Sequence, residues 1–401
     1  MAQPIRRKIQ EERPELVKEE PIYTLLIDGN ALLFHAMADD KRNSDGVHYG
    51  GVFQFLLQVR MMMQKKDFDY AYCFFDDEYS GWLRWKEYHG YKANRDKKYE
   101  DYGESEYMKL YNANLRRIQK AIFSKKTGKP LVKKEKSDWD IFIDENFVRE
   151  RDILLKYFEE LYIRWNIDDV TEGDDQIAYY CQHKKDNEKI VIITSDMDLS
   201  QLLAEDVIIY NMTDKDFVTT KNFTQKYGYF YKNVLIKKIF CGDVSDNISN
   251  ITGLSEEGFF KLMPEAKKRE VTVSEVKERA SDLIKERQSE KKKPLKLHEN
   301  IVNGVGNKKY DGDFYVINEK LIDLSHPLMS EKAKETMDSM MYAPIDPTGR
   351  SFANLYKYIL EDKIEELDSD ARFTSFFTLF KRLEEKEKKR YTESINFLYN
   401  C

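Results

Sequence analysis

The chain has 401 residues, which is enough for two or three domains and for a substantial hydrophobic core. Its 26 Tyr and 23 Phe exclude a wholly disordered chain, and no apolar run approaches the length of a membrane span. The four cysteines, Cys73, Cys181, Cys241 and Cys401, form no CxxC pair, and the polar residues 1–20 lack the apolar stretch of a signal peptide. We therefore expect a cytoplasmic protein without a disulfide framework and without membrane contact.

The net charge of −6 is unevenly distributed along the chain. Residues 84–136 contain 16 Lys and Arg against seven Asp and Glu, and residues 266–296 contain 11 against six. Two basic segments on an otherwise acidic chain indicate local binding of a polyanion. Solvated helix faces explain the same charge pattern equally well.

Apolar runs and helical spacing alternate through the first 230 residues. Strands are predicted at 23–27, 70–75, 162–167, 189–194 and 207–210, and helices at 47–66, 144–161 and 172–183. This alternation predicts an α/β fold with a doubly wound parallel sheet that is covered on both faces. Strand signals fade from residue 231 onward, so we expect an α/β domain at 21–230 and a helical domain at 231–401.

Three acidic residues follow predicted strands: Asp28, Asp76 and Asp196. The carboxyl ends of parallel strands face one ligand crevice, so these side chains are expected at one edge of the sheet. Taken singly, each is more simply explained as a turn residue or a helix N-cap.

Further acids stand in short clusters close to these strand ends. They are Glu172, Asp174 and Asp175, then Asp196 and Asp198, then Asp243 and Asp246, which share one face if that segment is helical. Nine carboxylates that converge repel one another unless divalent cations relieve the cost. Oxygen ligands without histidine favour Mg²⁺ or Mn²⁺ over zinc. Enough acids are present for two ions, which can clamp the attacking and leaving oxygens of a phosphodiester.

The segment after the second strand combines cations with aromatic residues. Lys92 and Arg95, one turn apart if helical, can neutralise a phosphate that develops charge, and Arg84 can grip a neighbouring phosphate. Unpaired bases can stack on Trp82, Trp85, Tyr88 and Tyr91. The alternative is an amphipathic helix whose aromatic residues are core and whose cations are solvated.

Six motifs, taken in order, resemble those of the 5′-nuclease (flap endonuclease) superfamily, most closely the phage ribonuclease H type of 5′-3′ exonuclease. They are IDGN (27–30), FFDD (74–77), SGWLRW…YKANR (80–95), EGDDQIA (172–178), TSDMDLSQLL (194–203) and GDVSDNISNITGL (242–254). The resemblance implies a PIN-like sheet, a basic helical arch at 84–136 and a C-terminal helical DNA-binding domain. It also implies metal-dependent removal of RNA primers and 5′ flaps during DNA replication, in host cytoplasm if a phage encodes the chain.

The resemblance further implies a role for each matching residue. One Mg²⁺ would be held by Asp28, Asp76, Glu172 and Asp174, and a second by Asp196, Asp198, Asp243 and Asp246, with Mn²⁺ as a substitute. Asp175 would lie between the ions, largely through water. Lys92 and Arg95 would contact the scissile phosphate, and Arg84, Tyr91 and Lys261 would contact DNA. A monomer acting on DNA with a 5′ flap, nick or RNA primer is expected, with a single-stranded-DNA-binding protein and a sliding clamp as partners.

Three questions stay open at this point. Either Asp76 or Asp77 can be the ligand after the second strand. The turn at 252–255 lacks the second glycine of the family's helix–hairpin–helix, so K⁺ capture there is in doubt. The alternatives to the nuclease are a PIN-type endoribonuclease and a non-catalytic nucleic-acid-binding scaffold. The first would lack the arch and GDVSDN, and the second would lack several acids.

Overall fold

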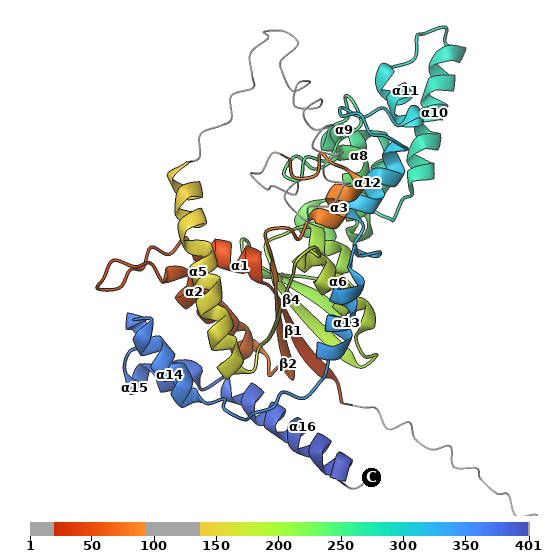
Figure 1. Ribbon diagram of the computed structural model, residues 1–401. Coiled ribbons are helices and arrows are strands. Elements are labelled where there is room, and N and C mark those ends of the chain that lie inside the picture. The colour runs from red at the N-terminus through yellow and green to blue at the C-terminus, as the bar shows by residue number, and fades with distance from the viewer. Residues whose placement is uncertain (1–19, 94–136, 400–401) are drawn as a thin grey trace, which may run out of the picture.

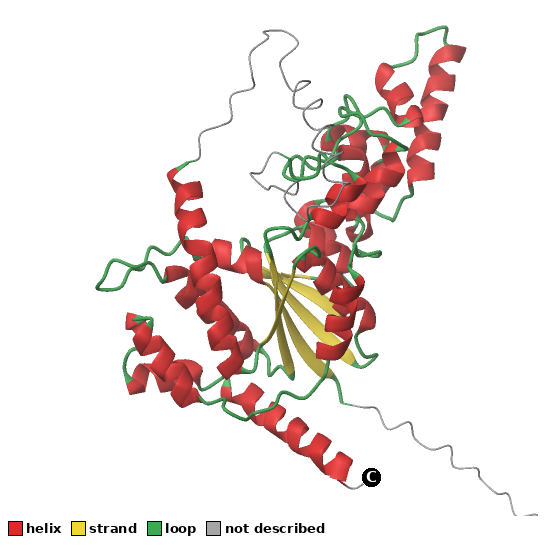
Figure 2. Cartoon of the chain, in the orientation of Figure 1, coloured by secondary structure: helices red, strands yellow, loops and turns green. Residues whose placement is uncertain are grey.

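One six-stranded sheet with helices on both faces forms the centre of the computed structural model, which describes residues 20–93 and 137–399 (Figures 1 and 2). The strand order is β3-β2-β1-β4-β5-β6. The strands are β1 (Ile22–Asp28), β2 (Tyr70–Asp76), β3 (Arg164–Asp168), β4 (Glu188–Thr194), β5 (Val207–Asn211) and β6 (Asp216–Val218). Strands β1 to β5 are parallel and β6 pairs antiparallel with β5, so the predicted doubly wound α/β sheet is confirmed. Each predicted strand lies within two residues of its observed bounds.

The two faces of the sheet are covered by different helices (Figure 1). One face packs against α1 (Gly29–Ala36), α2 (Gly50–Lys65), α5 (Asp138–Leu161), α14 (Phe352–Glu361), α15 (Asp370–Phe377) and α16 (Lys381–Tyr399). The other packs against α6 (Gly173–His183), α7 (Phe223–Tyr227) and α13 (Glu331–Met340). Alternate residues of β1 serve the two cores, since Leu25 lies in the first and Leu26 in the second, and this explains the apolar strand sequences.

Helix α5 begins at Asp138, six residues before the predicted start at 144. The side chain of Ser137 accepts from the backbone N–H of Asp140, whose carboxylate accepts from the backbone N–H of Ser137. This capping box satisfies two orphan backbone donors and adds charge that complements the helix dipole. The local cap therefore extends the helix beyond the region that apolar spacing marks.

A helical unit with its own core lies beyond the carboxyl ends of the strands. It contains α8 (Val234–Cys241), α9 (Glu256–Leu262), α10 (Val273–Ser289), α11 (Lys296–Asn303) and α12 (Phe314–Ile322). The helix α3 (Trp82–Glu87) contacts it through α12. Short 3-10 turns complete the elements: η2 (Asp198–Leu202), η3 (Tyr231–Asn233), η4 (Pro264–Lys267) and η5 (Glu365–Leu367).

After this helical unit the chain packs against the sheet again. The division into domains therefore differs from the expected boundaries of 21–230 and 231–401. Met337 is buried against one face of the sheet, and Phe377 and Leu383 are buried in the core of the other. A parallel sheet that is apolar on both faces needs cover on both, and the first 230 residues supply only part of it. The separate unit is therefore an insertion of residues 234–322.

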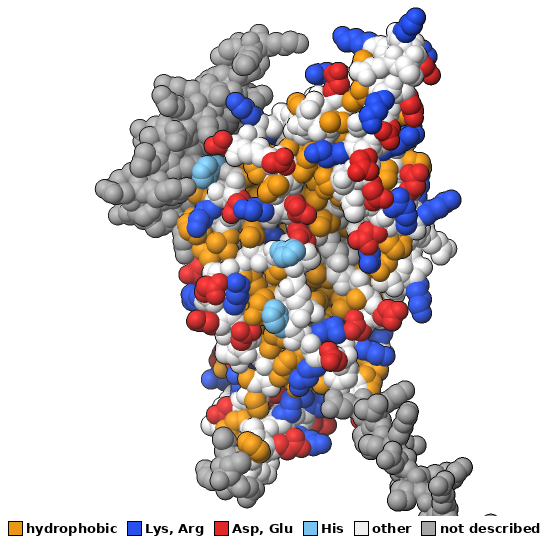
Figure 3. All heavy atoms as spheres, turned by 90° about the vertical axis from the view of Figure 1, so that its right-hand side faces the viewer, with side chains coloured by type: hydrophobic (Ala, Val, Ile, Leu, Met, Phe, Trp, Pro, Cys, Tyr) orange, Lys and Arg blue, Asp and Glu red, His pale blue; other side chains and the backbone are white. Residues whose placement is uncertain are grey.

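Charged side chains of both signs are mixed on one face of the molecule. Figure 3 shows Lys and Arg interspersed with Asp and Glu on the face it presents. Of the basic segment 84–136, residues 94–136 lie outside the described residues. None of the helices in the described parts of the chain has the length and apolar composition needed to cross a lipid bilayer.

Candidate metal centre

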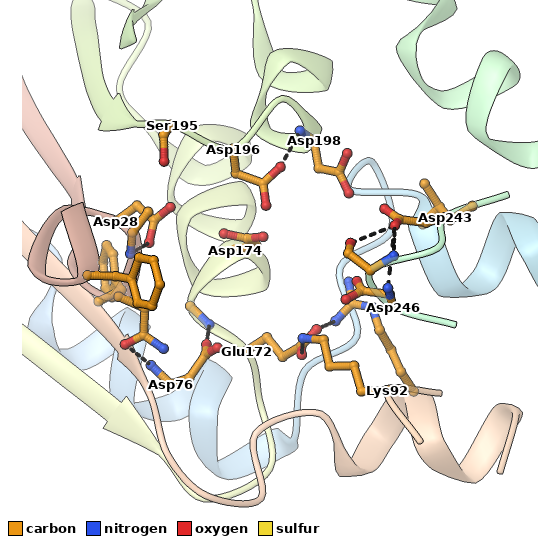
Figure 4. Close-up of a pocket in the computed structure, with 18 of the residues that line it drawn as sticks. Asp28, Asp76, Lys92, Glu172, Asp174, Ser195, Asp196, Asp198, Asp243 and Asp246 are labelled. Carbon is orange, nitrogen blue, oxygen red and sulfur yellow. Dashed lines mark hydrogen bonds and ion pairs between the residues drawn. The ribbon is translucent and has the colours of Figure 1, made fainter. Parts of the chain in front are cut away.

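A cavity of about 750 Å³ lies between the carboxyl ends of the strands and the helical unit. Its walls come from α1, α3, α5, α6, η2 and the loop that follows α8. Eight of the nine acids singled out in the sequence line it (Figure 4): Asp28, Asp76, Glu172, Asp174, Asp196, Asp198, Asp243 and Asp246. Strand ends that are distant in sequence meet here because β1 and β4 are neighbours at the switch point of the sheet.

Asp28 ends β1 and is the N-cap of α1, where its side chain accepts from the backbone N–H of Ala31 at 3.0 Å. The hydroxyl of Thr194, the last residue of β4, donates to its other oxygen at 2.7 Å. Burial raises the pKa of Asp28 to about 7, and the nearby Asp196 and Asp76 add to the rise while both hydrogen bonds oppose it. The simpler N-cap explanation is thus correct, and the same side chain also faces the cavity.

Asp174 lies in the first turn of α6 among four other acids. Burial raises its pKa well above the ordinary value, and repulsion from Asp28, Asp196, Asp76 and Glu172 raises it further. Among residues 20–93 and 137–399, no Lys, Arg or His lies within 4 Å of the carboxylates of Asp28, Asp76, Asp174 and Asp196. No described cation pairs with these four acids, and a divalent cation would relieve the repulsion between them.

The structure separates Asp76 from Asp77. Asp76 lines the cavity, and one of its oxygens accepts from the backbone N–H of Gly173 at 2.8 Å. Asp77 does not line it, and its backbone N–H donates to the hydroxyl of Ser80. Consecutive residues leaving a strand point in opposite directions, so only one of the two can face the cavity.

A lysine that the sequence analysis did not single out lies among the acids at the other end of the cavity. Lys238 of α8 pairs with Asp198 and, at 2.6 Å, with Asp243. Burial raises the pKa of Asp198 to about 6, whereas the Lys238 pair and hydrogen bonds from Ser245 overcome burial and lower the pKa of Asp243 to about 2. Asp243 and Asp246 lie in a turn and not on a helix, and Asp243 Oδ1 accepts from the Ser245 amide.

Lys92 is in contact with the acids, although not from a helix as predicted. It follows α3 in a turn with φ of 50°, and its backbone N–H donates to the carbonyl of Asp246 at 2.9 Å. Its ammonium group pairs with Glu172, which outweighs burial and raises the pKa of Lys92 well above the ordinary value. Lys92 therefore enters the cavity as a charged group. Arg95 lies outside the described residues.

Arg84 and Asp175 form a buried pair and not a phosphate grip. The guanidinium of Arg84 binds both oxygens of Asp175, one at 2.9 Å, and also pairs with Glu172 at 2.7 Å. Its remaining Nε donates to the carbonyl of Leu321 at 2.9 Å. Asp175 is fully buried and does not line the cavity, so a position between two ions does not agree with this structure. One residue step along α6 turns Asp175 inward and Asp174 toward the cavity.

Two of the four predicted base-stacking residues are buried, and the other two, Trp82 and Tyr88, are half-buried. Tyr91 is 2% exposed and its hydroxyl contacts Glu172 at 2.9 Å, while Trp85 is 3% exposed. Neither ring offers a free face, so for these two the amphipathic-helix alternative is correct. Lys261 lies exposed on α9, away from the cavity wall, and pairs with Glu257 at 2.7 Å.

The donor chemistry fits divalent cations, although no ready-made ligand set is present. Within the described ranges, no three Asp, Glu, His or Cys side chains are gathered closely enough to hold an ion as they stand. The carboxylates repel one another in the absence of ions. Lys92 forms an ion pair with Glu172, and Lys238 forms ion pairs with Asp198 and Asp243. The uncompensated acids around Asp174 nevertheless provide only oxygen donors, which suits Mg²⁺ or Mn²⁺.

Part of this chain matches the sequence model of a known protein family. Residues 23–126 and 141–228 match the family described as 5′-3′ exonuclease, N-terminal resolvase-like domain. This match covers just under half of the chain, and that part belongs to the 5′-nuclease superfamily.

Relatives with a similar sequence match only part of this chain. DNA polymerase I of Caldicellulosiruptor bescii is 33% identical over 124 residues, which cover 28% of this chain and 15% of that protein. A 5′-3′ exonuclease of Mycoplasmopsis pulmonis is 31% identical over 121 residues, which cover 30% of this chain and 40% of that protein. The matches therefore span less than half of either relative.

Solved structures support the fold over a longer stretch. The phage T5 5′-exonuclease with bound zinc has a TM-score of 0.54 at 14% identity, covering 79% of this chain and 96% of that chain. A phage T5 flap endonuclease in a complex with DNA and metal ions has a TM-score of 0.51 at 14% identity, covering 91% of this chain and 99% of that chain. At this identity the likeness shows the fold alone.

Proposed function

We propose that the chain is a metal-dependent, structure-specific 5′-nuclease that hydrolyses phosphodiesters of DNA or of RNA–DNA hybrids in DNA replication. The observation that carries this proposal is the convergence of eight acids from five separate segments on one cavity of a 5′-nuclease fold. A non-catalytic scaffold would have no use for a group of mutually repelling carboxylates, which cost stability when no cation neutralises them.

We assign these eight acids to two Mg²⁺ positions, as the resemblance implies. Asp28, Asp76, Glu172 and Asp174 would hold one ion, and Asp196, Asp198, Asp243 and Asp246 the other. Bound ions would lower the pKa of a water molecule and neutralise charge on the phosphate. We assign Asp175 to a positioning role, in which it holds Arg84 and through it Glu172.

We infer that Lys92 is the protein group that acts on the phosphate. Its ammonium reaches Glu172 at the cavity wall, and a phosphate that enters can replace Glu172 as its partner. A cation there stabilises charge that grows in the transition state, so it acts on rate more than on binding. Arg95 keeps the same proposed role from the segment outside the described residues.

The test is cleavage of a 5′-labelled flap duplex and of an RNA-primed duplex by the full chain in Mg²⁺. Both substrates should be shortened from the 5′ end, and a chelator should stop the reaction. Asp174→Asn should lower the rate by at least about 10³-fold, because it removes the acid at the centre of the group. Asp186→Asn, on the loop before β4, is the matched control and should cut at the parental rate.

The alternatives predict different substrates. Cleavage of single-stranded RNA with no activity on the flap duplex would favour the endoribonuclease. Flap binding with no cleavage in Mg²⁺ or Mn²⁺ would favour the scaffold. A monomeric state, a cytoplasmic location and pairing with a single-stranded-DNA-binding protein and a sliding clamp stay proposals that rest on the resemblance.

A further inference from the structure

Lys238 occupies the place that a cation would take between Asp198 and Asp243. We propose that its ammonium group is a built-in counter-ion that must be displaced before the second divalent cation binds, so that Lys238 sets the affinity of that site. The inference rests on the proposed function and adds a residue to it that neither the motifs nor the comparisons single out.

The contacts of Lys238 carry the argument. It lies in the last turn of α8, and its ammonium bridges Asp198 of η2 and Asp243 of the loop after α8. The three side chains are 18%, 20% and 13% exposed, so water screens the pairs only weakly. One positive charge therefore holds two carboxylates that belong to different units of the molecule.

The backbone around Lys238 keeps this arrangement in place. The amide of Gly242 donates to the carbonyl of Lys238 at 2.7 Å, and Gly242 has φ of 68°, which turns the chain back toward the helix. A Cβ at position 242 would lie 2.6 Å from the backbone nitrogen of Asn250, so no other residue fits this turn. The turn at the end of α8 therefore positions Asp243 next to Lys238.

The rest of the acid group differs in this respect. Asp28, Asp76, Asp174 and Asp196 have no cation within 4 Å among the residues that the structure describes. Of the four acids proposed for the first ion, only Glu172 is paired with described cations, Lys92 and Arg84. At the second site Lys238 holds two of the four acids with one charge, so a second ion should bind against stronger electrostatic competition. The two sites are thus expected to fill in order.

The experiment titrates the metal-free full chain with Mn²⁺ and follows the free ion by electron paramagnetic resonance. The parental chain should bind one Mn²⁺ tightly and a second at least about tenfold more weakly. Lys238→Gln should tighten the second site by roughly tenfold and leave the first unchanged. Lys237→Gln is the matched control: Lys237 is 17% exposed, pairs with Glu256 at 3.2 Å, and should bind like the parent.

A second measurement uses the unaltered chain. Amine acetylation read by mass spectrometry should be slow at Lys238 without metal and several-fold faster with saturating Mn²⁺, while the rate at Lys237 stays constant. A weaker or lost second site in Lys238→Gln would overturn the inference, because Lys238 would then be organising the ligands. So would an unchanged second site, or an acetylation rate that ignores Mn²⁺. Absence of any Mn²⁺ binding would instead contradict the proposed function.

Discussion

The hydroxyl of Thr194 donates to the Asp28 carboxylate at 2.7 Å and so joins the ends of β1 and β4. These neighbouring strands flank the switch point of the sheet, where the chain leaves in opposite directions. Burial raises the pKa of Asp28 to about 7, and without this opposing hydrogen bond the pKa would be higher still. Thr194 therefore helps to keep Asp28 ionised near neutral pH.

Thr194→Val should weaken this ionisation and raise the Mg²⁺ concentration needed for half-maximal cleavage by about five- to tenfold, since one hydrogen bond to a charged group is lost. The deficit should shrink at pH 8.5, where Asp28 is ionised without help. Thr378→Val removes an exposed hydroxyl bond on α15 and should behave like the parent. Equal deficits at pH 7 and pH 8.5 would contradict this role.

Metal removal should reverse the usual dependence of stability on pH. The folded-state pKa of Asp28 is about 7 and that of Asp174 is raised still more clearly, so the folded chain binds more protons than the unfolded one above pH 4. The stability that protonation contributes is full below pH 4 and is lost as pH rises through about 7. With a chelator, the free energy of unfolding should fall by on the order of 2 kcal/mol between pH 5 and pH 7.5.

Asp28→Asn serves as the control for that experiment, because it removes one of the raised groups and should flatten the slope. Thermal unfolding followed by circular dichroism measures both chains. Saturating Mg²⁺ should abolish the loss in the parental chain. A slope that is the same with and without Mg²⁺ would show that the cavity acids are not its source.

Adjacent aspartates provide a test of which strand-end residue acts. Asp76→Asn should lower cleavage by roughly 10²- to 10³-fold, because Asp76 faces the cavity, and Asp77→Asn should change it by less than about threefold. Both variants keep the size of the side chain, and Mn²⁺ affinity should fall only for Asp76→Asn. The opposite ranking would contradict the orientation of the turn after β2.

We expect substitution of Arg84 to lower the free energy of unfolding more than it weakens DNA binding. Arg84→Met leaves Asp175 buried without its partner, and removing one member of a buried pair costs about 3–5 kcal/mol. Urea unfolding should show this loss, and the double variant Arg84→Met with Asp175→Leu should recover part of it. Lys86→Met, two residues along α3 and exposed, should be neutral. An Arg84 variant of normal stability but weak DNA binding would restore the phosphate-grip hypothesis.

The position of the last helices can be tested through two phenylalanines. Phe377 is fully buried in the core beneath the sheet, so Phe377→Ala should cost about 3–5 kcal/mol. Phe397 on α16 is 70% exposed, and Phe397→Ala should change stability by less than about 0.5 kcal/mol. Equal effects of the two substitutions would argue that α15 does not pack on the sheet.

Much of the fold and of the acid group could be predicted from the sequence, because both depend on local patterns. Apolar runs mark the strands, and an acid that follows a parallel strand can face the crevice edge, as Asp28 and Asp196 do. The orientation of Asp175 could not be predicted, because its partner Arg84 is 91 residues away. The role of Lys238 could not be predicted either, because its pairing with Asp198 depends on the packing of η2 against α8.

The placement of residues 324–399 was also beyond the sequence. Their spacing indicates amphipathic helices, but an apolar stripe does not say which surface it will cover. Only the folded structure shows that α14 and α15 pack into the same core as α2 and α5. Likewise, β6 has three residues, too few to show a period of two.

Cover supplied by the last helices has a consequence for synthesis. While a ribosome is still making residues 234–322, the sheet already has its strands but one of its faces lacks α14, α15 and α16. The apolar face of the nascent chain stays exposed to aggregation until residues near Leu383 leave the ribosome. Folding of the sheet should therefore finish only after most of the chain has been translated.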